Sequence, residues 1–339
     1  MRYVVLALVV GLLIAGYMYY SYEKSKVEEY PTNISVEKEN MEFKKNTQNI
    51  QEEYKEGTIP WLKQQTYNPQ KLQIENTITS NSDFTSYKVS YKSQDNISIY
   101  ALMHIPAGDV PQGGWPILIF NHGYIPPEQY STESSYKDYS ESYARKGFIV
   151  IKSDYRGHDK SEGKANNSLG RIDYAMDVLN LMETLPSIEN ANLDKIFMYG
   201  HSMGGEVSLV AAEVNNKVKG ISLWAPAVKE FPENPAFFLR RPENVARLSE
   251  FELALETVPP KDYPMYGAIT NLDKLEAPII LHHGTLDESV PYQWAIDLEK
   301  ELIQADKSVQ FYTYQNDNHN LTASFTTVVE RDVEFFNSL

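Results

Sequence analysis

The sequence predicts an α/β protein with a mostly parallel, eight-stranded sheet that is flanked by helices. One observation is that short, nearly continuous apolar runs such as PILIF, FIVI and PIIL recur along the chain. Such runs are typical of strands that are buried on both faces. A second observation is that segments with helical periodicity separate most of these runs. Strands that alternate with helices form a parallel sheet through right-handed crossovers.

The first two expected strands follow each other without a helix, so we expect an antiparallel hairpin at the start of the sheet. The expected strands are Phe84–Tyr91, Ile97–His104, Ile117–Asn121, Phe148–Ser153, Ile196–Gly200, Gly220–Trp224, Ile279–His282 and Val309–Tyr314. Apolar residues three and four positions apart predict helices over Ile172–Leu179, Trp294–Leu302 and Leu321–Phe336. Ligands bind at the carboxyl ends of parallel strands, so the residues that follow each strand are the first candidates for function.

The composition limits the classes of function. A chain of 339 residues with 42% hydrophobic residues can form one large globular domain. Its net charge of −15 and its lack of a Lys/Arg-rich run argue against nucleic-acid binding. The absence of cysteine excludes disulfides, thiolate metal sites and a cysteine nucleophile. No metal site is expected, because the adjacent His282 and His283 would point to opposite faces of a strand and the chain has no HExxH spacing. No oligomeric state is predicted.

An uncharged apolar run, YVVLALVVGLLIAGYMYY, spans residues 3–20. It is just long enough to cross a bilayer core of roughly 30 Å, and its terminal tyrosines fit the aromatic belt of a membrane interface. We therefore expect a membrane anchor over residues 1–22. The alternative is a cleaved signal peptide, although no A-x-A-like site follows the run. Residues 23–75 are then a polar spacer, and residues 76–339 form the globular domain, which we expect outside the cytoplasm.

A candidate nucleophile lies in the segment Gly200-His201-Ser202-Met203-Gly204, between an apolar strand and a helical stretch. This is the G-x-S-x-G pattern in the strand–turn–helix setting that exposes a serine on a sharp turn. The two glycines are needed because side chains there would collide with neighbouring backbone. The turn also places Ser202 at the start of a helix, whose free N–H groups favour a developing oxyanion.

A serine hydroxyl needs a base to accept its proton. Among the seven histidines we choose His319, whose polar loop follows the last expected strand and reaches the same edge of the sheet as Ser202. The base in turn needs a carboxylate that fixes its tautomer and stabilises the imidazolium. Asp287, which also follows a strand, is the best candidate; Glu288 is its rival and Asp317 is a weaker one.

The oxyanion of a tetrahedral intermediate needs preorganised N–H donors. We expect the backbone N–H groups of Met203 and of Tyr124, which lies in the turn after the strand Ile117–Asn121. The hydroxyl of Tyr124 could instead line the acyl site. Another strand is followed by Asp154 and Arg156, which we interpret as a structural pair in a glycine-rich turn.

Roughly fifty residues separate the strand Gly220–Trp224 from the next expected strand, more than one crossover helix requires. We expect a helical cap insertion over residues 228–273, above the active site. Its aromatic residues form either an apolar substrate pocket or the core of the cap itself. Arg240 and Arg241 either receive a substrate carboxylate or form a solvated face. We prefer the structural interpretation in both cases.

These segments together resemble the α/β-hydrolase superfamily, and more narrowly the catalytic domain of the prolyl oligopeptidase family of serine peptidases and related esterases. The matching segments are Phe120–Tyr124, Ser153–His158, Gly200–Gly205, His283–Asp287 and Asn318–His319. The resemblance implies a triad of Ser202, Asp287 and His319, in the chain order of that superfamily. It also implies acyl-enzyme chemistry without a cofactor.

The expected function is hydrolysis of an ester or a short peptide or amide bond through an acyl-enzyme at Ser202. Family peptidases usually carry an N-terminal propeller that screens substrates, whereas a polar spacer precedes this domain. This difference slightly favours a small acyl ester over a peptide substrate. A prolyl oligopeptidase-like peptidase proper is one alternative. A non-catalytic protein that keeps the fold to bind a ligand is another, but it would be expected to lack a member of the triad.

Overall fold

The computed structural model describes residues 54–164, 169 and 171–339. Within them lies a nine-stranded sheet with the order β1-β2-β3-β5-β4-β6-β7-β8-β9. The strands are β1 (Gln73–Ser80), β2 (Phe84–Lys92), β3 (Ser98–Pro106), β4 (Trp115–Asn121), β5 (Ile149–Ser153), β6 (Ala191–His201), β7 (Val218–Trp224), β8 (Ile279–Gly284) and β9 (Val309–Tyr314). Strands β4 to β9 pair in parallel, whereas β1, β2 and β3 pair antiparallel. The sheet is therefore mostly parallel, and the expected hairpin is β2–β3.

The prediction of eight strands is wrong by one, because it omits β1. This strand lies at the edge of the sheet, and most of its residues are exposed. Its pairing with β2 is interrupted by two register shifts. An edge strand that buries so little apolar surface shows no alternating pattern that a sequence reader can detect.

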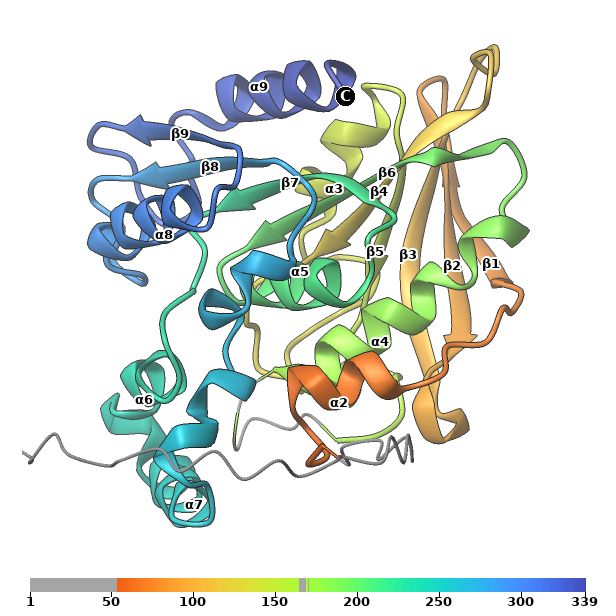
Figure 1. Cartoon of the computed structure of the whole chain (residues 1–339). Coiled ribbons are helices and arrows are strands. Elements are labelled where there is room, and N and C mark those ends of the chain that lie inside the picture. Colours follow the sequence, from red (N-terminus) through yellow and green to blue (C-terminus); the bar gives the residue numbers. More distant parts are fainter. Residues whose placement is uncertain (1–53, 165–168, 170) are drawn as a thin grey trace, which may run out of the picture. The chain divides into compact units, whose positions relative to one another are not determined.

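Helices cover both faces of the sheet (Figure 1). They are α2 (Ile59–Gln64), α3 (Lys137–Ala144), α4 (Ile172–Met182), α5 (Met203–Val214), α6 (Glu233–Leu239), α7 (Val245–Leu255), α8 (Tyr292–Gln304) and α9 (Phe325–Asn337). One apolar cluster joins the sheet to α2, α4, α5 and α8. Another joins it to α3 and α9. Short 3-10 turns lie at Gln94–Asn96, Leu185–Ser187, Pro242–Asn244, Pro260–Met265, Ala268–Thr270 and Leu272–Lys274.

The register of the parallel strands brings their carboxyl ends to one edge of the sheet. Asn121 at the end of β4 lies opposite Gly200, and His201 at the end of β6 lies opposite Trp224. Further along, Trp224 lies opposite His282 of β8. The segments that follow β4, β6, β7 and β8 therefore begin side by side.

A helical segment separates β7 from β8, as the long interval in the sequence predicts. It contains α6 and α7, which Figure 1 shows apart from the sheet. Phe231, Leu239, Phe251 and Tyr266 pack in a small apolar cluster within it. Most of its aromatic residues are thus its own core.

The expected anchor, residues 1–22, and most of the expected spacer, residues 23–75, lie outside the described residues. In the part that is described, no helix has the length and apolar character needed to span a membrane. The end of the spacer packs on the domain, since Ile59 and Leu62 of α2 are fully buried.

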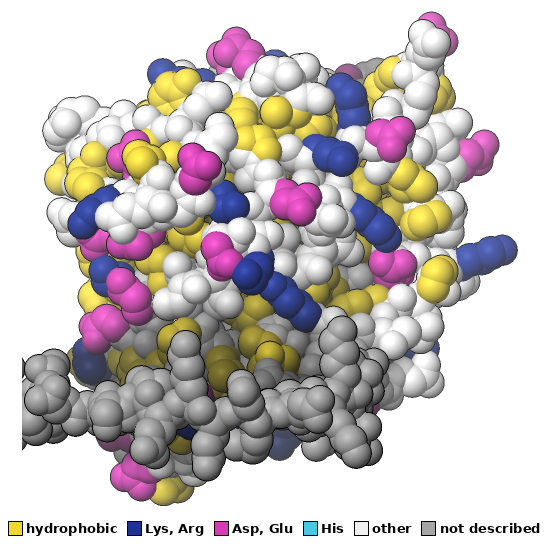
Figure 2. All heavy atoms as spheres, in the orientation of Figure 1, with side chains coloured by type: hydrophobic (Ala, Val, Ile, Leu, Met, Phe, Trp, Pro, Cys, Tyr) yellow, Lys and Arg dark blue, Asp and Glu magenta, His cyan; other side chains and the backbone are white. Residues whose placement is uncertain are grey.

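Acidic and basic side chains are interspersed on the face shown in Figure 2.

Candidate active site

Ser202 lies on the sharp turn between β6 and α5. Its φ of 53° and ψ of −117° belong to a region that non-glycine residues rarely adopt. Two of its backbone hydrogen bonds connect it to the end of β7: Ser202 N–H donates to Trp224 O, and Ala227 N–H donates to Ser202 O, both at 2.9 Å. The end of β7 therefore fixes the backbone of the candidate nucleophile.

The two expected glycines allow the chain to pass close to itself at this turn. A Cβ atom on Gly200 would lie 2.5 Å from the carbonyl oxygen of Gly204. A Cβ atom on Gly204 would overlap the carbonyl oxygen of Asn121. Only glycine fits at either position, as the G-x-S-x-G pattern predicts.

His319 and Asp287 meet in the loops that follow β9 and β8. The Nδ1 atom of His319 lies 2.8 Å from Oδ2 of Asp287. The other carboxylate oxygen, Oδ1, accepts the backbone N–H groups of Ser289 and Val290, each at 2.8 Å. These contacts fix the carboxylate in the orientation that a base-orienting group needs.

Asp287 also contacts a second histidine. The Nε2 atom of His283 lies 3.0 Å from Oδ2 of Asp287, and both side chains are fully buried. Burial alone would raise the pKa of the Asp287 carboxyl, but hydrogen bonds from His283 and His319 hold that pKa well below its ordinary value. Asp287 is therefore ionised at neutral pH.

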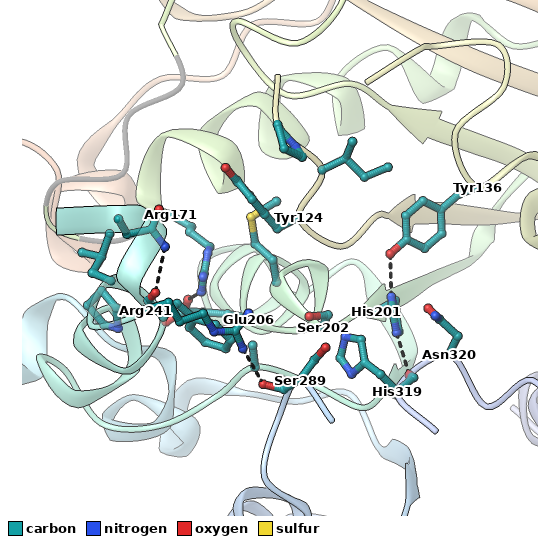
Figure 3. A pocket seen from close by; sticks show the side chains of 18 of the residues that line it. Tyr124, Tyr136, Arg171, His201, Ser202, Glu206, Arg241, Ser289, His319 and Asn320 are labelled. Carbon is teal, nitrogen blue, oxygen red and sulfur yellow. Dashed lines mark hydrogen bonds and ion pairs between the residues drawn. The ribbon is translucent and has the colours of Figure 1, made fainter. Parts of the chain in front are cut away.

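Ser202 and His319 line the same cavity, which has a volume of about 800 Å³. Figure 3 shows the His319 imidazole beside the Ser202 side chain. The cavity is lined by Tyr124, Ile125, Pro126, Tyr136, Tyr139, Arg171, His201, Ser202, Met203, Glu206, Ala227, Pro235, Phe238, Leu239, Arg241, Asn244, Arg247, Ser289, His319, Asn320 and Thr322. The structure thus brings the three residues of the expected triad to one edge of the sheet.

His201 holds the backbone of the loop that carries His319, a role that the sequence did not indicate. Its Nε2 atom lies 3.0 Å from the backbone oxygen of His319, which can only accept, so Nε2 carries the proton. Its Nδ1 atom then accepts from the hydroxyl of Tyr136 at 2.6 Å. Burial lowers the pKa of His201 to about 3, so the ring is neutral. Figure 3 shows Tyr136, His201 and His319 in a row.

Met203 and Tyr124, the expected oxyanion donors, both line the cavity beside Ser202. Met203 is the first residue of α5, and Tyr124 lies in the loop after β4. Among the described residues, neither backbone N–H has a hydrogen-bond acceptor. Both groups are thus available to an oxyanion. The Tyr124 hydroxyl accepts a hydrogen bond from Arg247 at 3.3 Å.

The rival acids do not contact the His319 imidazole. Glu288 accepts the backbone N–H of His319 at 3.2 Å, which positions the loop and not the ring. Asp317 accepts the backbone N–H groups of Asn318 and Ser324, each at 2.9 Å. Their role in the described structure is to hold the loop that carries the base.

Asp154 and Arg156 were expected to pair with each other, and this prediction is wrong. Arg156 binds Asp177 of α4, with its Nη2 atom 2.7 Å from Oδ1. Asp154 instead accepts the hydroxyl of Thr132 at 2.7 Å. Both residues are structural, but residues that are close in the sequence point to different neighbours. Within the described residues, no cluster of three ligating side chains could hold a metal ion.

A family model described as serine aminopeptidase, S33, matches residues 116–256. The chain has the α/β-hydrolase fold. Among solved structures, an acetyl xylan esterase from Paenibacillus sp. R4 superposes with a TM-score of 0.63. That match has 16% identity and covers 81% of this chain and 91% of the esterase chain.

Two curated relatives are peptidases. The uncharacterized peptidase YtmA of Bacillus subtilis (strain 168) is 23% identical over 179 residues, which are 52% of this chain and 66% of that protein. Dipeptidyl peptidase 8 of Mus musculus is 21% identical over 255 residues, 70% of this chain but only 27% of the relative. The predicted resemblance to prolyl oligopeptidase-like peptidases and esterases is confirmed. The family match and these relatives are consistent with a serine hydrolase.

Proposed function

We propose that this α/β-hydrolase cleaves an ester or a short peptide or amide bond through an acyl-enzyme at Ser202. The observation that carries the proposal is the 2.8 Å contact between His319 Nδ1 and Asp287 Oδ2 at the edge where the turn presents Ser202. A serine, an imidazole and a buried carboxylate in this arrangement form the constellation that activates a serine hydroxyl.

The reaction follows from the roles of these groups. The Oγ atom of Ser202 attacks the substrate carbonyl while Nε2 of His319 takes its proton, and Asp287 stabilises the resulting imidazolium. The backbone N–H groups of Met203 and Tyr124 bind the oxyanion. His319 then protonates the leaving group, which departs and leaves the acyl group on Ser202. A water molecule, deprotonated by His319, attacks this ester, and collapse of the second intermediate releases the acid and restores Ser202.

We further propose that residues 228–273 act as a cap that limits the size of the substrate. Pro235, Phe238 and Leu239 of this segment line the cavity that contains Ser202. A cavity of about 800 Å³ suits a small ester or a short peptide. A small acyl ester is the favoured substrate, and a prolyl oligopeptidase-like peptidase is the alternative.

The apolar run of residues 3–20 supports a second part of the proposal, a membrane anchor with the catalytic domain outside the cytoplasm. The full chain should then stay with membranes after an alkaline carbonate wash, and protease added to intact cells without an outer barrier should digest the domain. Release by the wash would refute the anchor. Protection from the protease would refute the outward orientation.

Labelling by a fluorophosphonate probe tests the proposed chemistry, because the probe reacts with an activated serine. We expect the native protein to be labelled at Ser202 and the Ser202→Ala variant to be unlabelled and inactive. Ser289→Ala is the matched control, since Ser289 lines the same cavity but contributes only backbone atoms to the contacts described. An unlabelled native protein would favour a ligand-binding protein. A panel of 4-nitrophenyl esters and aminoacyl-4-nitroanilides then separates esterase from peptidase.

A further inference from the structure

One side of the cavity is basic, although the whole chain carries a net charge of −15. The charged residues that line the cavity are Arg171, Arg241, Arg247 and Glu206, apart from the histidines. Figure 3 draws Arg171, Glu206 and Arg241 on the side away from Tyr136 and His201. Among the described residues that line this side, three guanidinium groups thus stand beside one carboxylate.

The single acid among them already has a partner. Glu206 Oε2 lies 2.6 Å from Nη1 of Arg171, and both side chains are largely buried. Arg247 donates hydrogen bonds to the Tyr124 hydroxyl and to Oδ1 of Asn244, both at 3.3 Å. The carboxylate of Glu206 is therefore directed to Arg171, and it forms no ion pair with Arg241 in the described structure.

Arg241 is the guanidinium that the fold leaves most open to a ligand. It is half-buried, its Nη2 atom donates to the backbone oxygen of Ser289 at 2.9 Å, and its guanidinium lies 5.1 Å from the centre of the Phe238 ring. Among the described side chains, no carboxylate lies within ion-pair distance of it. Arg171 lies over the same ring at 5.8 Å. The Phe238 ring shields the Arg241 guanidinium from water on one side, which strengthens any ion pair formed there.

The neighbouring arginine differs in every one of these respects. Arg240 points to solvent with 60% of its side chain exposed, and it binds Glu233 at 3.2 Å. It does not line the cavity. The sequence could not distinguish these two adjacent arginines, whereas the structure assigns only Arg241 to the site.

We propose that the substrate of this hydrolase carries a carboxylate, which Arg241 binds while Ser202 attacks the carbonyl of the bond that is cleaved. The inference rests on the proposed function and specifies its substrate class. A planar guanidinium that still has free N–H donors is suited to bind a carboxylate with two hydrogen bonds. The carboxylate belongs either to the acyl part or to the leaving group.

Two pairs of esters, each matched in size, test the proposal on the full chain. Mono(4-nitrophenyl) glutarate and 4-nitrophenyl valerate differ by a carboxylate on the acyl side. The butyrate esters of 3-hydroxybenzoate and of 3-methylphenol differ by a carboxylate on the leaving group. We expect kcat/KM to be at least about tenfold higher for the charged member of one pair, which also shows on which side the carboxylate binds.

Two variants test whether Arg241 is the residue that causes the preference for the charged ester. Arg241→Gln should lower the ratio of kcat/KM between charged and neutral ester by about 10–100-fold, the usual effect of losing a hydrogen-bonded charge partner. Arg240→Gln, the matched control, should leave the ratio at the native value. A native protein without preference in either pair would overturn the proposal, and so would a preference that survives in Arg241→Gln.

Failure of this proposal and failure of the hydrolase proposal give different results. If neither pair is cleaved and the fluorophosphonate does not label Ser202, the hydrolase proposal fails. If Ser202 is labelled but no ester is cleaved, protection from labelling decides the question. We then expect 3-carboxyphenylboronate to protect at concentrations at least about tenfold lower than 3-methylphenylboronate, since boronates occupy the site of the attacked carbonyl. Equal protection would overturn the carboxylate proposal while leaving the hydrolase intact.

Discussion

At the scale of single residues, the carboxylate of Asp287 is the most completely satisfied group of the site. One oxygen contacts the rings of His283 and His319, and the other accepts two backbone N–H groups. A charge held by so many donors stays ionised and does not rotate. The tautomer of His319 is therefore set by Asp287, with Nδ1 protonated and Nε2 facing the substrate.

Replacing Asp287 by asparagine should test this role. Asp287→Asn keeps the size of the side chain but removes the charge that stabilises the imidazolium, so we expect kcat to fall by on the order of 10³–10⁴. Glu288→Gln is the control, because Glu288 contacts only the backbone of His319 and its loss should change kcat by less than about tenfold. Kinetics on a 4-nitrophenyl ester measure both variants. A larger loss in Glu288→Gln would identify Glu288 as the orienting acid.

His201 should remain neutral over the range in which most histidines titrate. Its pKa is lowered to about 3 by burial, so the ring gains a proton only well below pH 4. In an NMR titration the ring carbon signal of His201, assigned by its loss in His201→Asn, should not move between pH 8 and pH 4.5. A midpoint near pH 6 would mean that His201 is accessible to water and does not hold the His319 loop.

The sequence predicted the three residues of the candidate triad because each one follows a strand whose end is recognisable. The contacts of His201 and His283 could not be predicted in this way. His201 contacts the backbone oxygen of His319, and His283 contacts the carboxylate of Asp287. No local pattern indicates such partners. The only available signal was the position of His283 four residues before Asp287, at the end of the same strand.

At the scale of elements, the packing of α2 and α5 buries an acid at a cost in stability. Glu213 of α5 is buried, and neither of its carboxylate oxygens has a hydrogen-bond partner among the described residues. Burial raises the pKa of Glu213 well above its ordinary value, although the charge of Lys63 in α2 opposes this shift. The folded protein therefore holds the proton of Glu213 at a pH where the unfolded chain has lost it.

A neutral amide of the same size should stabilise the protein. Because the pKa of Glu213 is higher in the folded state, native stability falls as the pH rises above the unfolded pKa of about 4.5. We expect Glu213→Gln to raise the free energy of unfolding by about 1–3 kcal/mol at pH 8 and by less at pH 5. Urea unfolding at both pH values measures this. The exposed Glu330→Gln of α9 should show no such pH-dependent gain.

Elements with strong periodicity or buried runs were predictable, and β1 was not. The strands β4 to β8 are apolar because helices cover both of their faces. Strand β1 has one neighbour and mostly exposed residues, so its pairing with β2, and not its composition, makes it a strand. The bounds of α6 and α7 could not be predicted. The sequence showed only that the interval between β7 and β8 is too long for one crossover helix.

At the scale of the whole molecule, one buried carboxylate connects segments from most of the length of the domain. Asp332 of α9 is fully buried and is contacted from two strands and from α3. Its partners are Tyr143 OH at 2.5 Å, Ser222 Oγ at 2.7 Å, Trp224 Nε1 at 2.8 Å and His282 Nε2 at 2.8 Å. The C-terminal helix is thereby attached to the strands whose ends carry the site.

Removing this carboxylate should destabilise the entire domain. Asp332→Ala leaves four buried donors without an acceptor, so we expect the free energy of unfolding to fall by about 3–5 kcal/mol in a single cooperative transition. Asp194→Ala, on an exposed position of β6, should change it by less than about 0.5 kcal/mol. Urea denaturation followed by tryptophan fluorescence compares them. A small effect of Asp332→Ala would show that the apolar contacts of α9 are sufficient.

The hydrogen bonds between Ser202 and the residues at the end of β7 have a consequence for how such an enzyme diversifies. Their partners are Trp224 and Ala227, which lie just before residue 228, where the helical insertion starts. The residues of the proposed triad therefore all come from outside the insertion. Arg241 and Phe238, which line the cavity and on our proposal contact the substrate, come from inside it. If both proposals hold, a different insertion grafted between the same two junctions should change the substrate preference while the triad stays in place, provided that its contacts with α8, such as the ion pair of Lys229 with Asp297, are kept.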